Sequence, residues 1–130
     1  MLYFTDIVTR GYEADLTRRV PLPALFQYLE HLRWCSIIDP RSGLGSLVDV
    51  GYFFVVHQQR MVVRRAVGQD TPLRAYLWAE KVGRSSIDIG HEIRRLHDDA
   101  IVAEAHVTGL WLGPDRRLAR IPDALREFAG

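Results

Sequence analysis

Residues 73–109 read LRAYLWAEKVGRSSIDIGHEIRRLHDDAIVAEAHVTG, and three segments of this run alternate apolar with polar side chains. A period of two is typical of strands that bury one face, so the run predicts three neighbouring β-strands. The two breaks, Gly83–Ser85 and His97–Asp99, are short enough for hairpin turns. The run therefore predicts an antiparallel meander. Its core-facing positions are Leu73, Ala75, Leu77, Ala79, Ile87, Ile89, Ile93, Ile101, Ala103, Ala105 and Val107.

Several of these core-facing residues are small, which would let a helix approach the sheet closely. The segment from about Pro21–Ala24 to Ile38 predicts that helix, because prolines 21 and 23 suit its start and Pro40 and Gly43 stop it. Its apolar residues cover much of its circumference, which is typical of a buried helix.

The remaining elements complete the expected fold. Residues 2–12 and 52–67 predict strands, residues 41–51 a loop, Gly68–Asp70 a turn and Asp123–Phe128 a short helix. Together they predict one α+β domain over residues 1–130, with the order β-α-β-β-β-β. We expect an antiparallel sheet of five strands curled around one central helix.

Composition limits the classes of function. With 130 residues, 48% hydrophobic and 25% charged, the chain has the size and balance of one soluble globular domain. A net charge of +1 does not favour a nucleic-acid binder, and no apolar run suggests a membrane span or signal peptide. The single Cys35 excludes an internal disulfide, and the five histidines lack metal-ligand spacing. We expect a cytoplasmic protein without a metal.

Five short motifs, in order along almost the whole chain, resemble one family. They are Tyr12–Asp15, Leu25–Glu30, Val62–Arg65, Gly68–Asp70 and Arg120–Pro122. Together they resemble the hotdog-fold thioesterase superfamily, in its 4-hydroxybenzoyl-CoA and acyl-carrier-protein thioesterase branch. The resemblance implies hydrolysis of an acyl thioester by a homodimer or homotetramer with its site at the subunit interface. It implies no cofactor beyond the coenzyme A or phosphopantetheine of the substrate.

Asp15 is the catalytic candidate that this resemblance implies, as nucleophile or general base. On its chemistry alone, Asp15 is more typical of a helix cap or a surface carboxylate, and it is the resemblance that favours a catalytic role. It precedes a helix N-terminus, where negative charge is favoured and backbone N–H groups are free to hold an oxyanion. Pro21 and Pro23 have no N–H, which leaves those of Leu22 and Ala24, and Leu22 falls at the family's carbonyl-polarising position.

The candidate substrate-binding residues are polar residues in apolar or strand contexts. Glu30 in the helix is a pocket-lining or a structural residue. His57 and Gln59 interrupt an apolar strand, as residues lining a pocket or interface do, or as a hydrogen-bonded cluster does. Three arginines suit coenzyme A phosphates or an acidic carrier protein, or else solvated strand edges: Arg64, Arg65 and Arg84. His91 lies among the isoleucines of its strand, as a hydrogen-bonded core histidine does.

Two other functions on the same fold remain open. The residues that follow Asp15, Leu16–Leu22, lack the glycine and polar pair common in the family, which suits an acyl-thioester binder without catalysis. A dehydratase or hydratase usually needs an aspartate paired with a histidine, and no histidine lies near Asp15 in the sequence.

A different fold fits this sequence less well. An α+β cone fold of similar length usually opens with helices, whereas this chain opens with a predicted strand.

Overall fold

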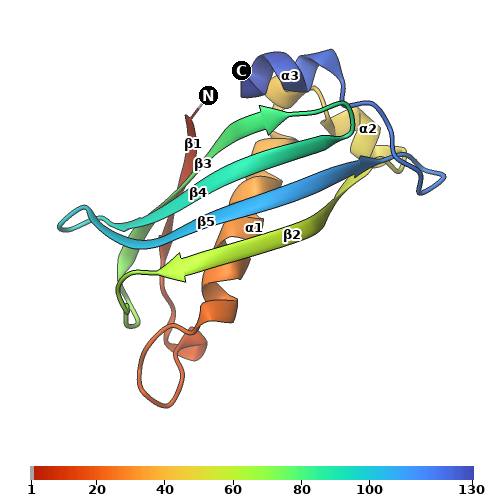
Figure 1. Cartoon of the computed structure of the whole chain (residues 1–130). Coiled ribbons are helices and arrows are strands. Elements are labelled where there is room, and N and C mark those ends of the chain that lie inside the picture. The colour runs from red at the N-terminus through yellow and green to blue at the C-terminus, as the bar shows by residue number, and fades with distance from the viewer. Residues whose placement is uncertain (1) are drawn as a thin grey trace.

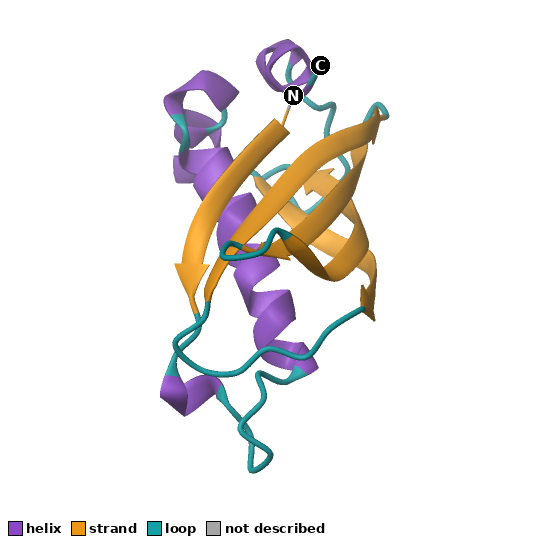
Figure 2. Ribbon diagram, turned by 90° about the vertical axis from the view of Figure 1, so that its left-hand side faces the viewer, coloured by secondary structure: helices purple, strands orange, loops and turns teal. Residues whose placement is uncertain are grey.

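A computed structural model describes residues 2–130 as one five-stranded antiparallel sheet that curves around a long helix (Figures 1 and 2). Helix α1 spans Leu22–Ile38, close to the predicted bounds. Strands and short helices are β1 (Leu2–Val8), β2 (Phe53–Val63), β3 (Pro72–Val82), β4 (Ser86–Arg95), β5 (Ala100–Leu112), α2 (Gly45–Asp49) and α3 (Asp123–Ala129). The expected fold class is confirmed.

The strands lie in the order β1-β3-β4-β5-β2, all in antiparallel pairs. The meander predicted from residues 73–109 is confirmed as β3, β4 and β5. Strand β2 does not pair with β3, its successor in the chain, but with β5 on the far side. Strands β1 and β2 are therefore the two free edges of the sheet (Figure 1).

Two predicted strand ends and one predicted loop were wrong. Strand β1 ends at Val8, and Gly11–Glu13 form a 3₁₀ turn. Strand β2 ends at Val63, because the N–H groups of Arg64 and Arg65 both donate to the carbonyl of Val102 and turn the chain out of the ladder. The segment predicted as a loop contains the 3₁₀ turn Pro40–Ser42 and helix α2.

The core lies between α1 and the concave face of the sheet. Leu29 and Leu32 of α1 have no exposed surface and pack in one cluster with Ala75, Ala103 and Ala105, so the predicted small-residue face receives the helix. The prediction that α1 is buried on most sides was wrong for the single chain. Trp34 on its other face is 49% exposed.

A second apolar cluster closes one end of the sheet. Trp111 is fully buried there, with the rings of Tyr52 and Phe54 at centroid distances of 5.6 and 4.7 Å. Leu125 of α3 packs in the same cluster, so the C-terminal helix caps this end. None of the helices in residues 2–130 has the length and apolar character needed to cross a membrane.

Candidate active site

Asp15 lies on an exposed loop that leads into α1, and its carboxylate is anchored by its own loop. Its Oδ1 accepts hydrogen bonds from the N–H of Thr17 at 2.8 Å, the hydroxyl of Thr17 at 2.5 Å and the N–H of Arg19 at 3.3 Å. The hydroxyl of Thr17 is the main reason that the pKa of Asp15 lies below its ordinary 3.8. The group is thus a carboxylate throughout the neutral range.

The first turn of α1 leaves one backbone donor near this loop. Leu22 is the first helical residue, so its N–H precedes the helical hydrogen-bond ladder. Pro23 has no N–H, and the N–H of Ala24 donates to the carbonyl of Pro21 at 3.1 Å. Ala24 was expected as a second donor, and its bond to Pro21 makes that expectation wrong. Leu22 is left as the candidate oxyanion donor.

A buried tyrosine fixes the turn that precedes Asp15. The hydroxyl of Tyr28 in α1 donates to Glu13 Oε1 at 2.6 Å, and the N–H of Arg10 donates to the same oxygen at 2.8 Å. Burial and the Glu13 carboxylate raise the pKa of Tyr28, so it remains a donor. Sequence reasoning missed this pair, because a separation of fifteen residues across a turn carries no periodic signal.

The loop is also tied to the sheet. The N–H of Val20 donates to the carbonyl of Val67 at 2.8 Å. Buried Thr9, at the end of β1, donates its hydroxyl to the carbonyl of Gly68 at 2.6 Å and accepts from the N–H of Thr71 at 2.9 Å. These bonds hold residues 9–20, which include Asp15, against residues 67–71.

A pocket of about 350 Å³ opens between the C-terminal half of α1 and the concave sheet. Its walls are mostly apolar, with Phe54, Leu77, Ile89 and Phe128 among them, and Glu30 and Arg33 of α1 also line it. The volume is within the range of about 300–1,000 Å³ that is typical of small-molecule sites.

Arg33 reaches the sheet through a histidine. Its Nη1–H donates to His91 Nε2 at 3.1 Å, while His91 Nδ1 lies 3.1 Å from the carbonyl of Tyr76. A carbonyl only accepts, so Nδ1 carries the proton and Nε2 is the acceptor. Burial first, then the charge of Arg33, lowers the pKa of His91 from 6.5 to about 3, so the ring is neutral. The prediction of a hydrogen-bonded core histidine is confirmed.

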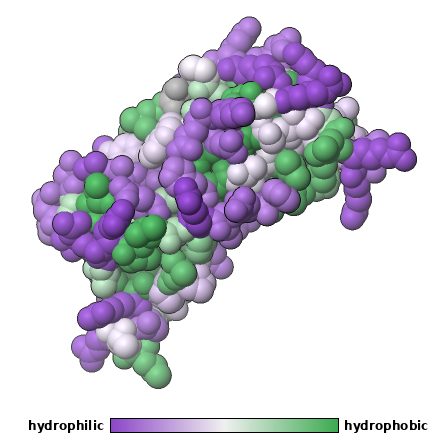
Figure 3. Space-filling model, in the orientation of Figure 1, coloured by the Kyte–Doolittle hydropathy of each residue, from purple (hydrophilic) through white to green (hydrophobic). Residues whose placement is uncertain are grey.

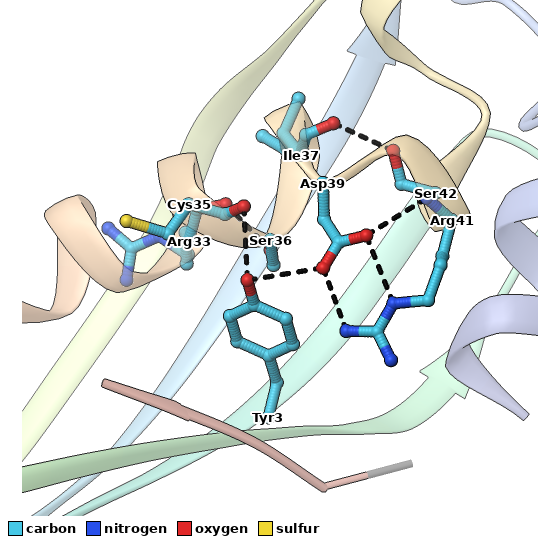
Figure 4. Close-up of polar contacts among 8 residues, drawn as sticks. All are labelled: Tyr3, Arg33, Cys35, Ser36, Ile37, Asp39, Arg41 and Ser42. Carbon is cyan, nitrogen blue, oxygen red and sulfur yellow. Dashed lines mark hydrogen bonds and ion pairs between the residues drawn. The ribbon is translucent and has the colours of Figure 1, made fainter.

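A polar cluster secures the end of α1 beside the pocket (Figure 4). The hydroxyl of Tyr3 in β1 donates to the carbonyl of Cys35 at 3.3 Å and lies 3.4 Å from Asp39 Oδ2. Arg41 donates through two nitrogens to Asp39, at 3.0 and 2.7 Å, and lowers the pKa of Asp39 to about 2. The sequence analysis did not anticipate this cluster, which joins residues far apart in the chain.

The predicted binding residues do not converge in the single chain. Glu30 lines the pocket, whereas His57 and Gln59 lie exposed on β2. Arg64 forms a two-nitrogen bond to Glu104 on the outer side of the sheet. Arg65 donates to the carbonyl of Ile101, and Arg84 lies exposed in the β3–β4 hairpin.

Asp15 does not line the pocket either. The start of α1 at Leu22 is eleven residues from Arg33, which is about 16 Å along a helix. Within residues 2–130, no group of three histidine, cysteine, aspartate or glutamate side chains is arranged to hold a metal ion.

Comparison with known proteins defines the class of fold. No family model matches this chain, and no curated protein matches it. The solved structure of PA2801 from Pseudomonas aeruginosa, named as a candidate thioesterase, is 23% identical over 100% of both chains, with a TM-score of 0.90. Slr0204 from Synechocystis, a 1,4-dihydroxy-2-naphthoyl-CoA thioesterase, is 12% identical over 97% of this chain and 93% of that chain, with a TM-score of 0.86.

A third similar structure contains a ligand. SAV2348 from Staphylococcus aureus, solved in complex with CoA, is 8% identical over 98% of this chain and 80% of that chain, with a TM-score of 0.88. These likenesses extend over nearly the whole sheet and helix. The chain has the hotdog fold.

Proposed function

We propose that this protein hydrolyses an acyl thioester of coenzyme A or of an acyl carrier protein to the free acid and the thiol. The observation that carries the proposal is an ionised, loop-anchored carboxylate, Asp15, on the loop that leads into a helix whose first N–H, that of Leu22, is outside the helical ladder. The thioesterase names of PA2801 and Slr0204, and the CoA bound to SAV2348, support it.

The chemistry needs few groups. As a general base, Asp15 takes a proton from water, and the resulting hydroxide adds to the thioester carbonyl. As a nucleophile, Asp15 itself adds to the carbonyl, and water then cleaves the acyl-enzyme anhydride. In both routes the N–H of Leu22 holds the oxyanion, the C–S bond breaks, and the thiolate leaves and takes up a proton.

The proposal includes a second copy of the chain. Strand β2 is a free edge of eleven residues, with Val56, Val62 and Val63 between 42% and 49% exposed. Figure 3 shows hydrophobic side chains along this lower edge of the molecule, interrupted by polar ones. An open apolar edge is a template for pairing with another strand. Pairing at β2 would give a homodimer, and a shared site would account for the separation of Asp15 from the pocket.

Thiol release from a panel of acyl-CoAs and acyl carrier proteins tests the function, with Asp15→Asn as the variant. Asparagine keeps the Oδ1 acceptor of the loop but removes the charge, so we expect release to fall by about 10²-fold or more. Asp49→Asn, an exposed aspartate on α2, is the matched control and should match the wild type.

Two outcomes would contradict the proposal, and the pH dependence of the wild type is a further check. Equal release by wild type and Asp15→Asn would remove Asp15 from the mechanism. Tight binding of acyl-CoA without release from any substrate would favour the acyl-thioester binder. Because the pKa of Asp15 is lowered, its protonation should not reduce wild-type kcat/KM until the pH falls below about 4, the ordinary range of a carboxyl.

A further inference from the structure

The pocket beside α1 contains a cation, Arg33, that forms no ion pair with a carboxylate among residues 2–130. Arg33 lines the pocket and is half-buried, and within residues 2–130 its side-chain hydrogen-bond partner is the neutral ring of His91. A neutral imidazole fixes the position of a guanidinium but leaves its full charge. Even partial desolvation of a charge without an ion partner is costly, so its place in an apolar pocket needs an explanation.

The contact with His91 places the guanidinium of Arg33 against the sheet. His91 is 1% exposed and belongs to β4, whose residue Ile89 lines the same pocket. A guanidinium has five N–H donors, and the bond to His91 uses one of them. The pocket therefore offers a fixed hydrogen-bond donor to a ligand that occupies it.

Glu30 lies one helical turn before Arg33 and lines the same pocket. Residues three apart on a helix are neighbours on one face, and Glu30 acts electrostatically on Arg33 without forming an ion pair with it. Its carboxylate can only accept hydrogen bonds and repels another anion. The pocket thus combines one half-buried donor with one exposed acceptor, and a carboxylate at the end of a ligand could satisfy only the donor and would be repelled by Glu30.

We propose that Arg33 and Glu30 are specificity-determining residues that select an acyl chain with a hydroxyl group at its distal end. A hydroxyl both accepts, from Arg33, and donates, to Glu30, whereas the rest of the chain contacts apolar walls such as Phe54 and Leu77. An unsubstituted chain would displace water from the half-buried guanidinium and offer it no acceptor. The inference rests on the proposed function, since it names the acyl group of the same substrate.

Equilibrium binding tests the selection without requiring turnover. The probes are three S-alkyl-CoA thioethers of equal chain length: octyl-CoA, 8-hydroxyoctyl-CoA and 7-carboxyheptyl-CoA, titrated by calorimetry. A hydrogen bond to a charged group supports an affinity for 8-hydroxyoctyl-CoA about tenfold above that for octyl-CoA. We expect 7-carboxyheptyl-CoA to bind more weakly than 8-hydroxyoctyl-CoA.

Variants separate selection from structural support. Arg33→Met keeps the length of the side chain but not its donors, so the ratio of hydroxyoctyl to octyl affinity should fall to about one. A role confined to holding His91 would weaken all three probes and leave the ratio unchanged, which would overturn the proposal. Glu30→Gln should raise the affinity for 7-carboxyheptyl-CoA. Arg117→Met, an exposed arginine of the turn after β5, is the control.

The wild type keeps the test decisive if Arg33→Met does not fold. Equal wild-type affinities for octyl-CoA and 8-hydroxyoctyl-CoA, or no binding of either, would overturn the inference. A clear preference in a protein that releases no thiol would sustain this inference while the proposed hydrolysis fails. Hydrolysis without a preference for the hydroxylated probe would sustain the proposed function while this inference fails.

Discussion

At the scale of single residues, His91 shows how a buried ring depends on its partners. Its place on the core face was readable from the period of two in β4, because a strand turns alternate side chains inward. Its partner Arg33 was not readable, since the two lie 58 residues apart and meet only after α1 crosses the sheet. In the same way, local motifs pointed to Asp15, whereas the bond from Tyr28 to Glu13 was missed because it joins two elements across a turn.

The neutral His91 predicts a pH-dependent stability. Its pKa is about 3 in the folded protein against 6.5 for a free ring, so the unfolded chain binds more protons between these values. Stability from this residue is therefore complete above pH 6.5 and is lost as the pH falls toward 3. The loss is at most about 1.4 kcal/mol per pH unit, or about 2 kcal/mol between pH 6.5 and pH 5.

Urea denaturation of the wild type and of His91→Gln at pH 7 and pH 5 measures this effect. The glutamine does not titrate, so its free energy of unfolding should fall less between the two pH values. The carboxylates that titrate in this range are common to both proteins and cancel in the comparison. An equal fall in the free energy of unfolding for both proteins would mean that the pKa of His91 is not lowered in the folded protein.

At the scale of elements, a glycine governs how β3 and β4 fit together. Trp78 of β3 lies opposite Gly90 of β4, and a Cβ at Gly90 would come within 2.3–2.6 Å of the indole ring. Alternation in the sequence predicted both strands, but a lone glycine in a strand did not reveal that an aromatic ring covers it. The place of β2 in the sheet was equally hidden, because β2 has the same pattern whether it pairs with β3 or with β5.

Gly90→Ala should destabilise the protein. Removing a strand glycine gains about 0.5–1 kcal/mol in backbone entropy, but overpacking against Trp78 costs about 1–3 kcal/mol, so the loss dominates. Chemical denaturation monitored by tryptophan fluorescence would measure it. Gly45→Ala in α2, where no atom lies within 4 Å of the added Cβ, should be neutral or stabilising. A Gly90→Ala protein as stable as the wild type would show that Trp78 moves away freely.

At the scale of the whole molecule, the two edge strands are not equivalent. Strand β2 has eleven residues and several exposed valines, whereas β1 has seven residues and is tied at its start to α1 by Tyr3. The exposed Trp34 face of α1 lies beside the pocket. The sequence predicted a helix buried on most sides. The single chain leaves that Trp34 face open, as expected if a second copy covers it.

Lysine substitutions on the two edges should have different effects on assembly. Val62→Lys places a charge on the β2 edge opposite Glu104 of its own chain, so the fold is retained while pairing of β2 with a second β2 is weakened. Val8→Lys, at 53% exposure on β1, is the control. Sedimentation velocity should show a dimer for the wild type and Val8→Lys, and a shift toward monomer for Val62→Lys. An unshifted Val62→Lys dimer would place the interface elsewhere.

The first and last elements meet at one end of the molecule (Figures 1 and 2). The rings of Tyr3 and Phe128 lie edge to face with centroids 6.3 Å apart. A circularly permuted chain could therefore join residues 130 and 2 through a short linker and open instead at the β4–β5 hairpin. Such a chain would keep all four strand pairings and the polar cluster around Asp39. The architecture depends on which segments pack together, and much less on their order along the chain.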